Sequence, residues 1–314
     1  MVVERYDFVI IGAGGTGLAA AMYAARLGLK ALVLGHSSGS EMPVGGVITT
    51  TNLVENYPGF PKISGTELAK KIEEHAREYK NVEIKNEEAK RICKTKEGFE
   101  VLTNKKKYFG KTILFATGTK WKKLVVDGAE KFENSGVSYC ALCDGPLYRN
   151  KIVAVIGGSD SAAKEALVLA EHAKKVYIIY RGAEIKPEPI NLKRVLSNKK
   201  IEIINNTNVI AVRGKSYVES VLLDRPFKRE KELRLDALFV AIGHEALSGL
   251  ASSLGVKLNQ KKEIVINHIN CKTSLAGVYA AGDVADKPFK QAITGVAEGC
   301  TAAYSAFEYI KKKS

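Results

Sequence analysis

The sequence predicts an α/β protein with two Rossmann-like nucleotide-binding domains, each built in three layers of the ββα type. An apolar segment, Tyr6–Ile11, runs into the glycine-rich run Gly12–Gly17, and a second one, Lys151–Ile156, runs into Gly157–Ala162. Each run is followed by an Ala- and Leu-rich stretch typical of a helix, and then by another apolar segment. Continuous apolar strands that alternate with helices indicate parallel sheets covered on both faces.

The size and composition agree with this prediction. At roughly 150 residues per domain, a chain of 314 residues corresponds to about two domains, and 46% of its residues are hydrophobic. No apolar run approaches the ~18 residues that span a membrane. The first residues carry two acids and lead directly into the first strand, so a signal peptide is not expected. We therefore expect a soluble, cytoplasmic protein.

The formal net charge of +14 has three interpretations. The first is a lysine-rich surface of the kind common in thermophiles. The second is attraction of an acidic protein partner or an anionic cofactor. The third, nucleic-acid binding, is disfavoured because the clusters Lys105–Lys107 and Lys311–Lys313 lack the interleaved aromatic residues of a single-strand groove.

The first glycine run has the spacing of a dinucleotide-binding turn. Gly12 permits the tight turn, Gly14 lets the backbone approach a pyrophosphate, and Gly17 lets the helix pack on the strand. The N–H groups at the start of the helix are then available to phosphate oxygens. The acid that usually holds the ribose after the second strand is missing, so we expect Ser37 or a backbone atom to take its place.

The second glycine run departs from the pattern. Ser159 replaces the middle glycine, and its Cβ narrows the approach of a pyrophosphate to the backbone. Ala162 replaces the last glycine, which is a common alternative. One interpretation is a second dinucleotide site. The other is a turn that has kept its shape and lost its ligand.

Between and after these runs the sequence predicts further elements. Residues Gly65–Lys80 have apolar residues at helical spacing, with His75 at the edge of the apolar stripe and no ligand role. The alternating segments Val82–Ile84 and Phe99–Leu102 predict short strands, and Ala237–Ile242 predicts another.

Cys140, Cys143 and Asp144 form a C-x-x-C-D motif between the two glycine runs. Half of a zinc site would need a second pair of ligands at matching spacing, which no nearby segment supplies, so no metal site is expected. A C-x-x-C in a cytosolic protein with two nucleotide-binding domains is typical of a redox disulfide. Asp144 is placed to protonate a leaving thiolate. The remaining cysteines, Cys93, Cys271 and Cys300, are interpreted as structural.

The segment Tyr139–Gly145 resembles the active site of the low-molecular-weight thioredoxin reductases, class II members of the pyridine nucleotide-disulfide oxidoreductases. The resemblance extends over nearly the whole chain. Its further matching segments are Gly45–Thr51, Val54–Phe60, Ala116–Gly118, Gly277–Asp283 and Lys290–Ile293.

The resemblance implies an FAD domain made of residues 1–115 and 243–314, with an inserted NAD(P)H-binding-like domain, 116–242, that carries the disulfide. The crossings, Thr117–Lys122 and Gly243–Ala246, are expected to be short strands that permit rotation. In this family Cys143 faces the flavin, Cys140 attacks a thioredoxin- or glutaredoxin-like partner, and the enzyme is a homodimer.

The motifs and the resemblance together give two sets of candidate cofactor residues. The expected FAD-binding residues are Gly12, Gly14, Gly15, Gly17, Gly46, Thr51, Asn56, Ala116, Gly118, Gly282, Asp283, Gln291 and Ala292. The candidate NAD(P)H-binding residues are Gly157, Ser159, Asp160, Ser161, Arg181 and Lys186.

The family reads the 2′-phosphate of NADPH with His-Arg-Arg-x-x-x-Arg, whereas this chain has Tyr180–Lys186. Gly182 replaces one arginine, Lys186 replaces another with a point charge, and Glu184 adds a negative charge. The donor is therefore left open among NADPH, NADH and another reductant. Four rival functions also stay open: a ferredoxin- or NAD(P)-linked reductase without disulfide chemistry, a flavin oxidase, a non-catalytic redox sensor and a nucleic-acid-associated flavoprotein.

Overall fold

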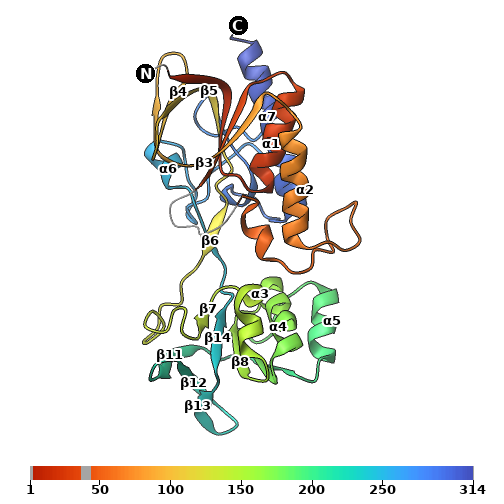
Figure 1. The fold of residues 1–314 in the computed structure, drawn as a ribbon. Coiled ribbons are helices and arrows are strands. Elements are labelled where there is room, and N and C mark those ends of the chain that lie inside the picture. Colours follow the sequence, from red (N-terminus) through yellow and green to blue (C-terminus); the bar gives the residue numbers. More distant parts are fainter. Residues whose placement is uncertain (1–2, 37–43, 314) are drawn as a thin grey trace. The chain divides into compact units, whose positions relative to one another are not determined.

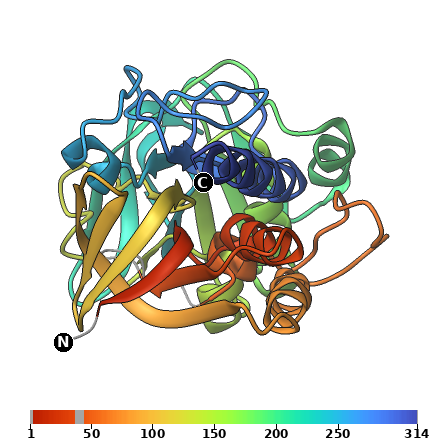
Figure 2. The same cartoon turned by 90° about the horizontal axis from the view of Figure 1, so that it is seen from above.

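The computed structural model describes residues 3–36 and 44–313. The chain forms two compact units, drawn in Figures 1 and 2. The first unit holds the chain up to Lys120 and again from Glu245, and the second unit holds Trp121–His244. The chain passes between the units through β6 (Thr119–Trp121) and β15 (His244–Ala246), which pair as a two-stranded sheet.

The first unit has three layers, as the sequence predicts. Parallel strands lie between the helices α1, α2 and α7 on one side and an antiparallel layer formed by parts of β3, β4 and β5 on the other. Its strands and helices are β1 (Glu4–Ile11), α1 (Gly15–Arg26), β2 (Ala31–His36), the 3₁₀ turn η1 (Gly46–Thr50), α2 (Gly65–Arg77), β3 (Val82–Lys94), β4 (Phe99–Thr103), β5 (Lys107–Phe115), α6 (Gly249–Ser253), β16 (Val278–Ala280), η3 (Gly282–Val284) and α7 (Ala292–Lys311).

The second unit repeats this plan. Its parallel sheet, in the order β10-β9-β8-β14-β7, has α3, α4 and α5 on one face and the antiparallel strands β11, β12 and β13 on the other. The elements are β7 (Val137–Ser138), α3 (Ala141–Asp144), η2 (Gly145–Tyr148), β8 (Ile152–Ile156), α4 (Asp160–His172), β9 (Lys175–Ile179), α5 (Pro189–Ser197), β10 (Ile201–Ile204), β11 (Val209–Gly214), β12 (Val218–Phe227), β13 (Glu230–Arg234) and β14 (Ala237–Val240).

Strand β3 is much longer than the short strand expected at Val82–Ile84. Its first half pairs in parallel with β2, and its second half, from Ala89 on, pairs antiparallel with β4. One strand therefore belongs to two layers, which short-range alternation does not reveal. The helix expected at Gly65–Lys80 ends at Arg77, and the strand expected at Ala237–Ile242 ends at Val240.

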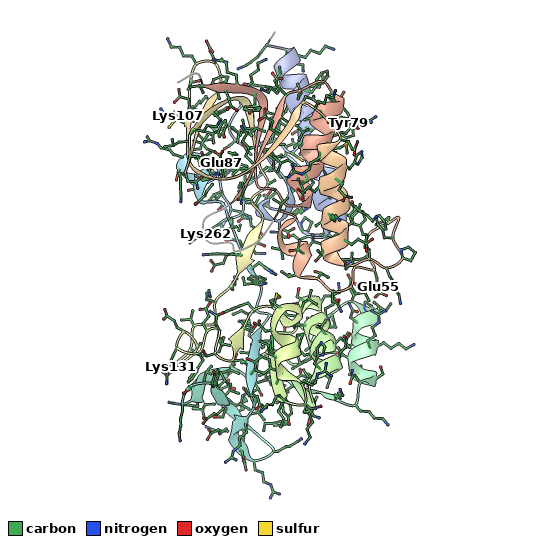
Figure 3. All side chains as sticks on the ribbon, viewed as in Figure 1. Glu55, Tyr79, Glu87, Lys107, Lys131 and Lys262 are labelled. Atoms are coloured by element: carbon green, nitrogen blue, oxygen red, sulfur yellow. A yellow bond between two sulfur atoms is a disulfide. The ribbon has the colours of Figure 1, made fainter. Side chains whose placement is uncertain are left out.

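A buried carboxylate ties this antiparallel layer together. Glu87, labelled in Figure 3, is 6% exposed and accepts hydrogen bonds from Thr103 Oγ1 at 2.7 Å and Tyr108 Oη at 2.8 Å. These residues come from β3, β4 and β5. A buried polar group is tolerated when it is hydrogen-bonded, so this contact fixes how the three strands meet.

Helices α1 and α7 lie side by side at a distance that only small residues allow (Figure 2). A Cβ added at Gly299 would lie 2.3 Å from the carbonyl oxygen of Thr16 and 3.3 Å from the backbone nitrogen of Ala20. Because α1 begins at the first glycine turn, this contact also fixes where that turn lies.

We predict that Gly299→Ala lowers the free energy of unfolding by about 1–3 kcal/mol, because the two helices must move apart. Urea unfolding followed by circular dichroism measures the change. Gly249→Ala is the matched control, since a Cβ there meets no atom within 4 Å. Equal stability of both variants would show that the helices have room to adjust.

Candidate active site

The first glycine turn borders a cavity of about 220 Å³ in the first unit. Gly12 has a φ of 115°, and a Cβ there would lie 2.2 Å from the carbonyl oxygen of Ala116. A Cβ on Gly17 would lie 2.0 Å from the carbonyl oxygen of Gly12. Both positions therefore need glycine, one for the turn and one for the packing of α1 on β1.

The space in front of α1 suits an anionic group. A Cβ at Gly14 would meet nothing closer than 3.8 Å, and the first turn of α1 has no acidic residue. The N–H groups at the helix start and the positive end of the helix dipole are thus open to a phosphate. These observations fit the pyrophosphate of a dinucleotide such as FAD.

A buried ion pair holds the loop that carries Asp283 against this cavity. Lys287, whose side chain is 4% exposed, pairs with Glu298 at 2.8 Å. The same Glu298 oxygen accepts the N–H of Gly282 at 2.8 Å, and Lys287 also donates to Thr294 Oγ1 at 3.3 Å. The Lys287–Glu298 pair therefore links the start of η3 to α7.

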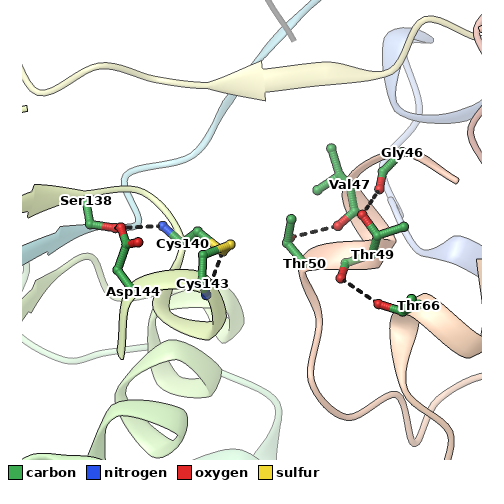
Figure 4. Close-up of a disulfide and its surroundings, with 9 residues drawn as sticks. All are labelled: Gly46, Val47, Thr49, Thr50, Thr66, Ser138, Cys140, Cys143 and Asp144. Atoms are coloured by element: carbon green, nitrogen blue, oxygen red, sulfur yellow. Dashed lines mark hydrogen bonds between the residues drawn. A yellow bond between two sulfur atoms is a disulfide. The ribbon is translucent and has the colours of Figure 1, made fainter. Parts of the chain in front are cut away.

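Part of the cavity wall comes from η1. Within it, Thr49 Oγ1 donates to the Gly46 carbonyl and Thr50 Oγ1 to the Val47 carbonyl, each at 2.8 Å (Figure 4). Thr66, on α2, donates to the Thr49 carbonyl at 3.2 Å. Threonine hydroxyl groups thus donate to backbone carbonyl groups of η1, because this 3₁₀ turn is too short to pair them all within itself.

Most of the residues expected to bind FAD meet at this one cavity. Those that line it are Gly12, Gly14, Gly15, Gly46, Thr51, Ala116, Gly118, Gly282, Asp283, Gln291 and Ala292. Gly17 lies beneath the turn instead, and Asn56 donates its amide to Gln291 Oε1 at 3.0 Å. Ser37, expected near the ribose, lies outside the described residues.

Several lining residues were not singled out from the sequence. Thr16, Gly35, Leu247 and Gly295 also border the cavity. Gly35 is the last residue but one of β2, and its place just before the missing acid was the signal available in the sequence.

The second unit carries the redox motif. Cys140 and Cys143 form a disulfide in which Cys140 caps the short helix α3 (Figure 4). The N–H of Cys143 donates to Cys140 Sγ at 3.2 Å. Cys143 is exposed and Cys140 is half-buried. The pair is therefore formed and accessible.

Asp144 is linked to the backbone N–H of Cys140 through Ser138. Ser138 Oγ donates to Asp144 Oδ2 at 2.6 Å and accepts the N–H of Cys140 at 3.2 Å. Ser138 is 6% exposed and ends β7. It was not picked out from the sequence, because a serine two residues before a cysteine has no special pattern.

Two other cysteines are unsuited to redox chemistry. Burial raises the pKa of the Cys271 thiol to about 12, and burial also raises the pKa of Cys300. A thiol with a raised pKa carries little thiolate at neutral pH and reacts slowly.

The residues proposed for NAD(P)H lie around the second glycine turn. Ser159 and Ser161 are exposed at the start of α4, and Arg181 and Lys186 are exposed on the following loop. Asp160 is engaged by the N–H of Glu188 at 2.9 Å and the amide of Asn191 at 2.8 Å.

Among residues 3–36 and 44–313, no helix combines the length and apolarity required to cross a bilayer.

Comparison with known proteins points to one family. A model of the family described as pyridine nucleotide-disulphide oxidoreductase matches residues 6–299. The thioredoxin reductase of Treponema pallidum is 37% identical and covers 97% of each chain. The solved T. acidophilum thioredoxin reductase has a TM-score of 0.91 at 36% identity, covering 99% of this chain and all of that one. A ferredoxin-flavin thioredoxin reductase from Clostridium acetobutylicum is 32% identical with the same coverage and a TM-score of 0.52.

We predict that Lys287→Met weakens FAD binding about tenfold, which corresponds to about 1.4 kcal/mol. The change leaves Glu298 partly buried without its cation and loosens its bond to Gly282. Fluorescence titration of the apoprotein with FAD measures the dissociation constant. Lys272→Met, at an exposed position of the same unit, is the control. Unchanged affinity in Lys287→Met would show that the loop is held by its other contacts.

A partly buried acid on α4 gives a pH prediction. Burial raises the pKa of Glu165 from 4.5 to about 8, and its Oε2 has no hydrogen-bond partner among the described residues. The folded protein keeps a proton there that the unfolded chain releases, so stability falls as pH rises from about 4.5 to about 8.

We therefore expect Glu165→Gln to match the wild type at pH 4 and to exceed its stability at pH 9 by on the order of 5 kcal/mol. Urea unfolding at both pH values measures the difference. Glu171→Gln, at an exposed site on the same helix, should show no such pH dependence. The same stability difference between wild type and Glu165→Gln at both pH values would mean that water reaches the carboxylate.

Proposed function

The chain belongs to the pyridine nucleotide-disulphide oxidoreductase family and is an FAD-dependent oxidoreductase of the thioredoxin reductase type, and we propose that it reduces the disulfide of a thioredoxin- or glutaredoxin-like protein through Cys140 and Cys143. The observation that carries this proposal is the Cys140–Cys143 disulfide in a chain that covers 97% of a thioredoxin reductase. Neither a flavin oxidase nor a nucleic-acid-associated flavoprotein would need an accessible disulfide of this kind.

The cavity of the first unit is the proposed FAD site. The start of α1 with Gly14 would hold the pyrophosphate, and Asp283 on η3 would bind the sugar-alcohol chain. When bound, FAD accepts two electrons from a donor and makes them available to a disulfide. The Lys287–Glu298 pair keeps the Asp283 loop in place for this binding.

The two cysteines then carry out thiol–disulfide exchange. Reduction breaks the Cys140–Cys143 bond with two electrons and two protons and yields two thiols. The Cys140 thiolate attacks one sulfur of the partner, which forms a mixed disulfide and releases one partner thiolate. The Cys143 thiolate attacks Cys140 Sγ, which re-forms the internal disulfide and releases the second partner thiolate.

The neighbours of the sulfurs support these roles. The N–H of Cys143 donates to Cys140 Sγ, and this hydrogen bond favours the anionic form of Cys140 after reduction. Asp144 is positioned through Ser138 next to the backbone of Cys140, so it can protonate a leaving thiolate. Both contacts lie within the second unit.

Two classes of electron donor are consistent with the relatives. The family uses FAD with NADPH, whereas the Clostridium acetobutylicum relative is described as a ferredoxin-flavin enzyme. This chain departs from the NADPH-reading motif at Gly182 and Lys186. The resemblance to the family also implies a homodimer, which sedimentation equilibrium would test.

We predict that Cys140→Ser and Cys143→Ser each lower the turnover of a thioredoxin disulfide by at least about a thousandfold, because exchange needs both sulfurs. Under anaerobic conditions the assay resupplies reduced methyl viologen as the electron donor, subtracts the rate without enzyme, and follows thiol formation on oxidised thioredoxin. Cys300→Ser is the control and should keep full turnover. Full activity in Cys140→Ser would remove the role assigned to that residue.

A non-catalytic redox sensor would behave differently in the same assay. Its reduced form would transfer one pair of electrons at most and would not turn over when reductant is resupplied. Repeated turnover therefore separates the enzyme from the sensor.

A further inference from the structure

Three threonines that border the cavity of the first unit differ from all other threonines of the described chain. They are Thr16 on α1, Thr51 directly after η1 and Thr119 at the start of β6. Across the described ranges 3–36 and 44–313, none of their hydroxyls has a hydrogen-bond partner. Every other threonine in these ranges has a hydrogen bond at its hydroxyl. Within the described chain, the threonine hydroxyls without a partner therefore all belong to this cavity.

Thr16 lacks the bond that a helical threonine commonly makes. The hydroxyl of a threonine in a helix often donates to the carbonyl three or four residues earlier. Thr301 on α7 does so, because its Oγ1 donates to the Ala297 carbonyl at 3.0 Å. For Thr16 the carbonyls at that spacing belong to Gly12 and Ala13, and within the described ranges its hydroxyl bonds to neither. The side chain is therefore not held by its own helix.

Two glycines leave room for the Thr16 hydroxyl. A Cβ on Gly282 would lie 2.7 Å from Thr16 Oγ1, and a Cβ on Gly295 would lie 2.6 Å from the same oxygen. Both glycines border the same cavity as Thr16. Three elements, α1, η3 and α7, thus meet around one oxygen atom, and a larger residue at either glycine would displace it.

The three hydroxyls reach open space although their residues are buried or half-buried. Thr119 is only 8% exposed, and Thr16 and Thr51 are half-buried. None of the three oxygens is among the fully enclosed side-chain atoms of the described chain that lack a partner. Since all three residues border one cavity, their oxygens face into it. A hydroxyl in such a place is satisfied by water or by a ligand.

The neighbours of Thr16 indicate which part of FAD its hydroxyl would contact. Thr16 lies in the first turn of α1, where free N–H groups and the helix dipole favour a phosphate. On the other side of its oxygen, Gly282 directly precedes Asp283, the residue proposed to bind the sugar-alcohol chain. A hydroxyl between these two groups fits the phosphate that carries this chain, because a hydroxyl donates readily to a phosphate oxygen.

We propose that the Thr16 hydroxyl donates a hydrogen bond to the flavin-side phosphate of FAD, and that the Thr119 hydroxyl forms a further hydrogen bond with the cofactor. Thr51 was already expected among the FAD-binding residues, whereas Thr16 and Thr119 were not. The inference rests on the FAD site of the proposed function and is independent of the identity of the protein substrate.

These hydroxyls act in binding and not in folding. They have no partner to lose among the described residues, so a change from Thr to Val, which has the same shape, removes no hydrogen bond from the described chain. A hydrogen bond to a charged phosphate is stronger than one to a neutral group. The loss at Thr16 is therefore expected to exceed the loss at Thr119.

The first experiment measures the FAD dissociation constant of the holoenzyme. The protein is diluted in steps, and the FAD that passes an ultrafiltration membrane is measured at each step. We expect Thr16→Val to raise the constant at least about tenfold and Thr119→Val about threefold, whereas Thr16→Ser stays within about twofold because it keeps the hydroxyl. Thr301→Val is the matched control and should leave the constant unchanged, since that hydroxyl bonds to its own helix.

Each outcome decides one part of the proposal. A wild-type constant in Thr16→Val, or equal weakening in Thr16→Val and Thr16→Ser, overturns the role given to Thr16. A wild-type constant in Thr119→Val overturns the role given to Thr119. Circular dichroism checks that each variant keeps the fold, and Thr16→Ala takes the place of Thr16→Val if that variant does not fold.

Phosphorus NMR of the holoenzyme tests which phosphate Thr16 contacts. Bound FAD has two phosphorus atoms, so the hydrogen bond from Thr16 affects mainly one of the two resonances. We expect Thr16→Val to shift the flavin-side resonance more than the adenosine-side resonance, and Thr301→Val to shift neither. A larger shift of the adenosine-side resonance, or no shift of either, overturns the assignment to the flavin-side phosphate.

Failure of this inference and failure of the proposed function can be told apart. If the wild type binds FAD and Thr16→Val binds it equally well, only the Thr16 contact is wrong. If the wild type binds FAD but does not reduce oxidised thioredoxin with methyl viologen as donor, the proposed partner is wrong and the result for Thr16 still stands. A wild type that binds no FAD overturns the FAD site and this inference together.

Discussion

The close approach of each glycine turn to the end of a neighbouring strand is the constraint on which the rest of the structure depends. Gly12 lies against the carbonyl of Ala116, just after β5, and Gly157 lies against that of Ala241, just after β14. These strand ends lead within a few residues into β6 and β15, where the chain passes from one unit to the other. The same contact therefore shapes the ligand-binding turn and fixes where the chain leaves the unit. A side chain at either glycine would disturb both.

A shared backbone does not imply a shared ligand. In the first unit the first turn of α1 carries no acid, so the positive end of its dipole and its free N–H groups remain available. In the second unit Asp160 begins α4, and although burial would raise its pKa, Lys164, Asn191 and the Glu188 N–H hold that pKa below its usual value. The strand, turn and helix are needed for the fold in both units, whereas the ligand depends on a few side chains around the turn.

The sequence was sufficient for the parts of the molecule that depend on local pattern. The two strand–glycine–helix units and the three-layer fold followed from apolar runs and glycine spacing, and the disulfide followed from C-x-x-C. The length of β3 did not follow, because its second half is specified by pairing with β4 and by the hydrogen bonds of Glu87 with Thr103 and Tyr108. Ser138 and the Lys287–Glu298 pair were also out of reach. Each joins residues whose meeting depends on tertiary packing, and nothing in their own sequence neighbourhood marks it.

The redox pair is placed where its chemistry does not disturb the fold. It closes a loop with a sequence separation of three, so by chain entropy the bond contributes about 2 kcal/mol, less than half of what a 100-residue loop would give. Of the C-x-x-C segment only Ala141 belongs to the core between the sheet and α4, while Cys143 is exposed. Breaking the bond therefore leaves the apolar core and the parallel sheet intact. The link from Asp144 through Ser138 to the backbone of Cys140 does not involve the sulfur–sulfur bond, so it can hold the segment in place in both redox states. A disulfide that must open and close in every catalytic cycle requires this separation between the bond that reacts and the contacts that maintain the fold.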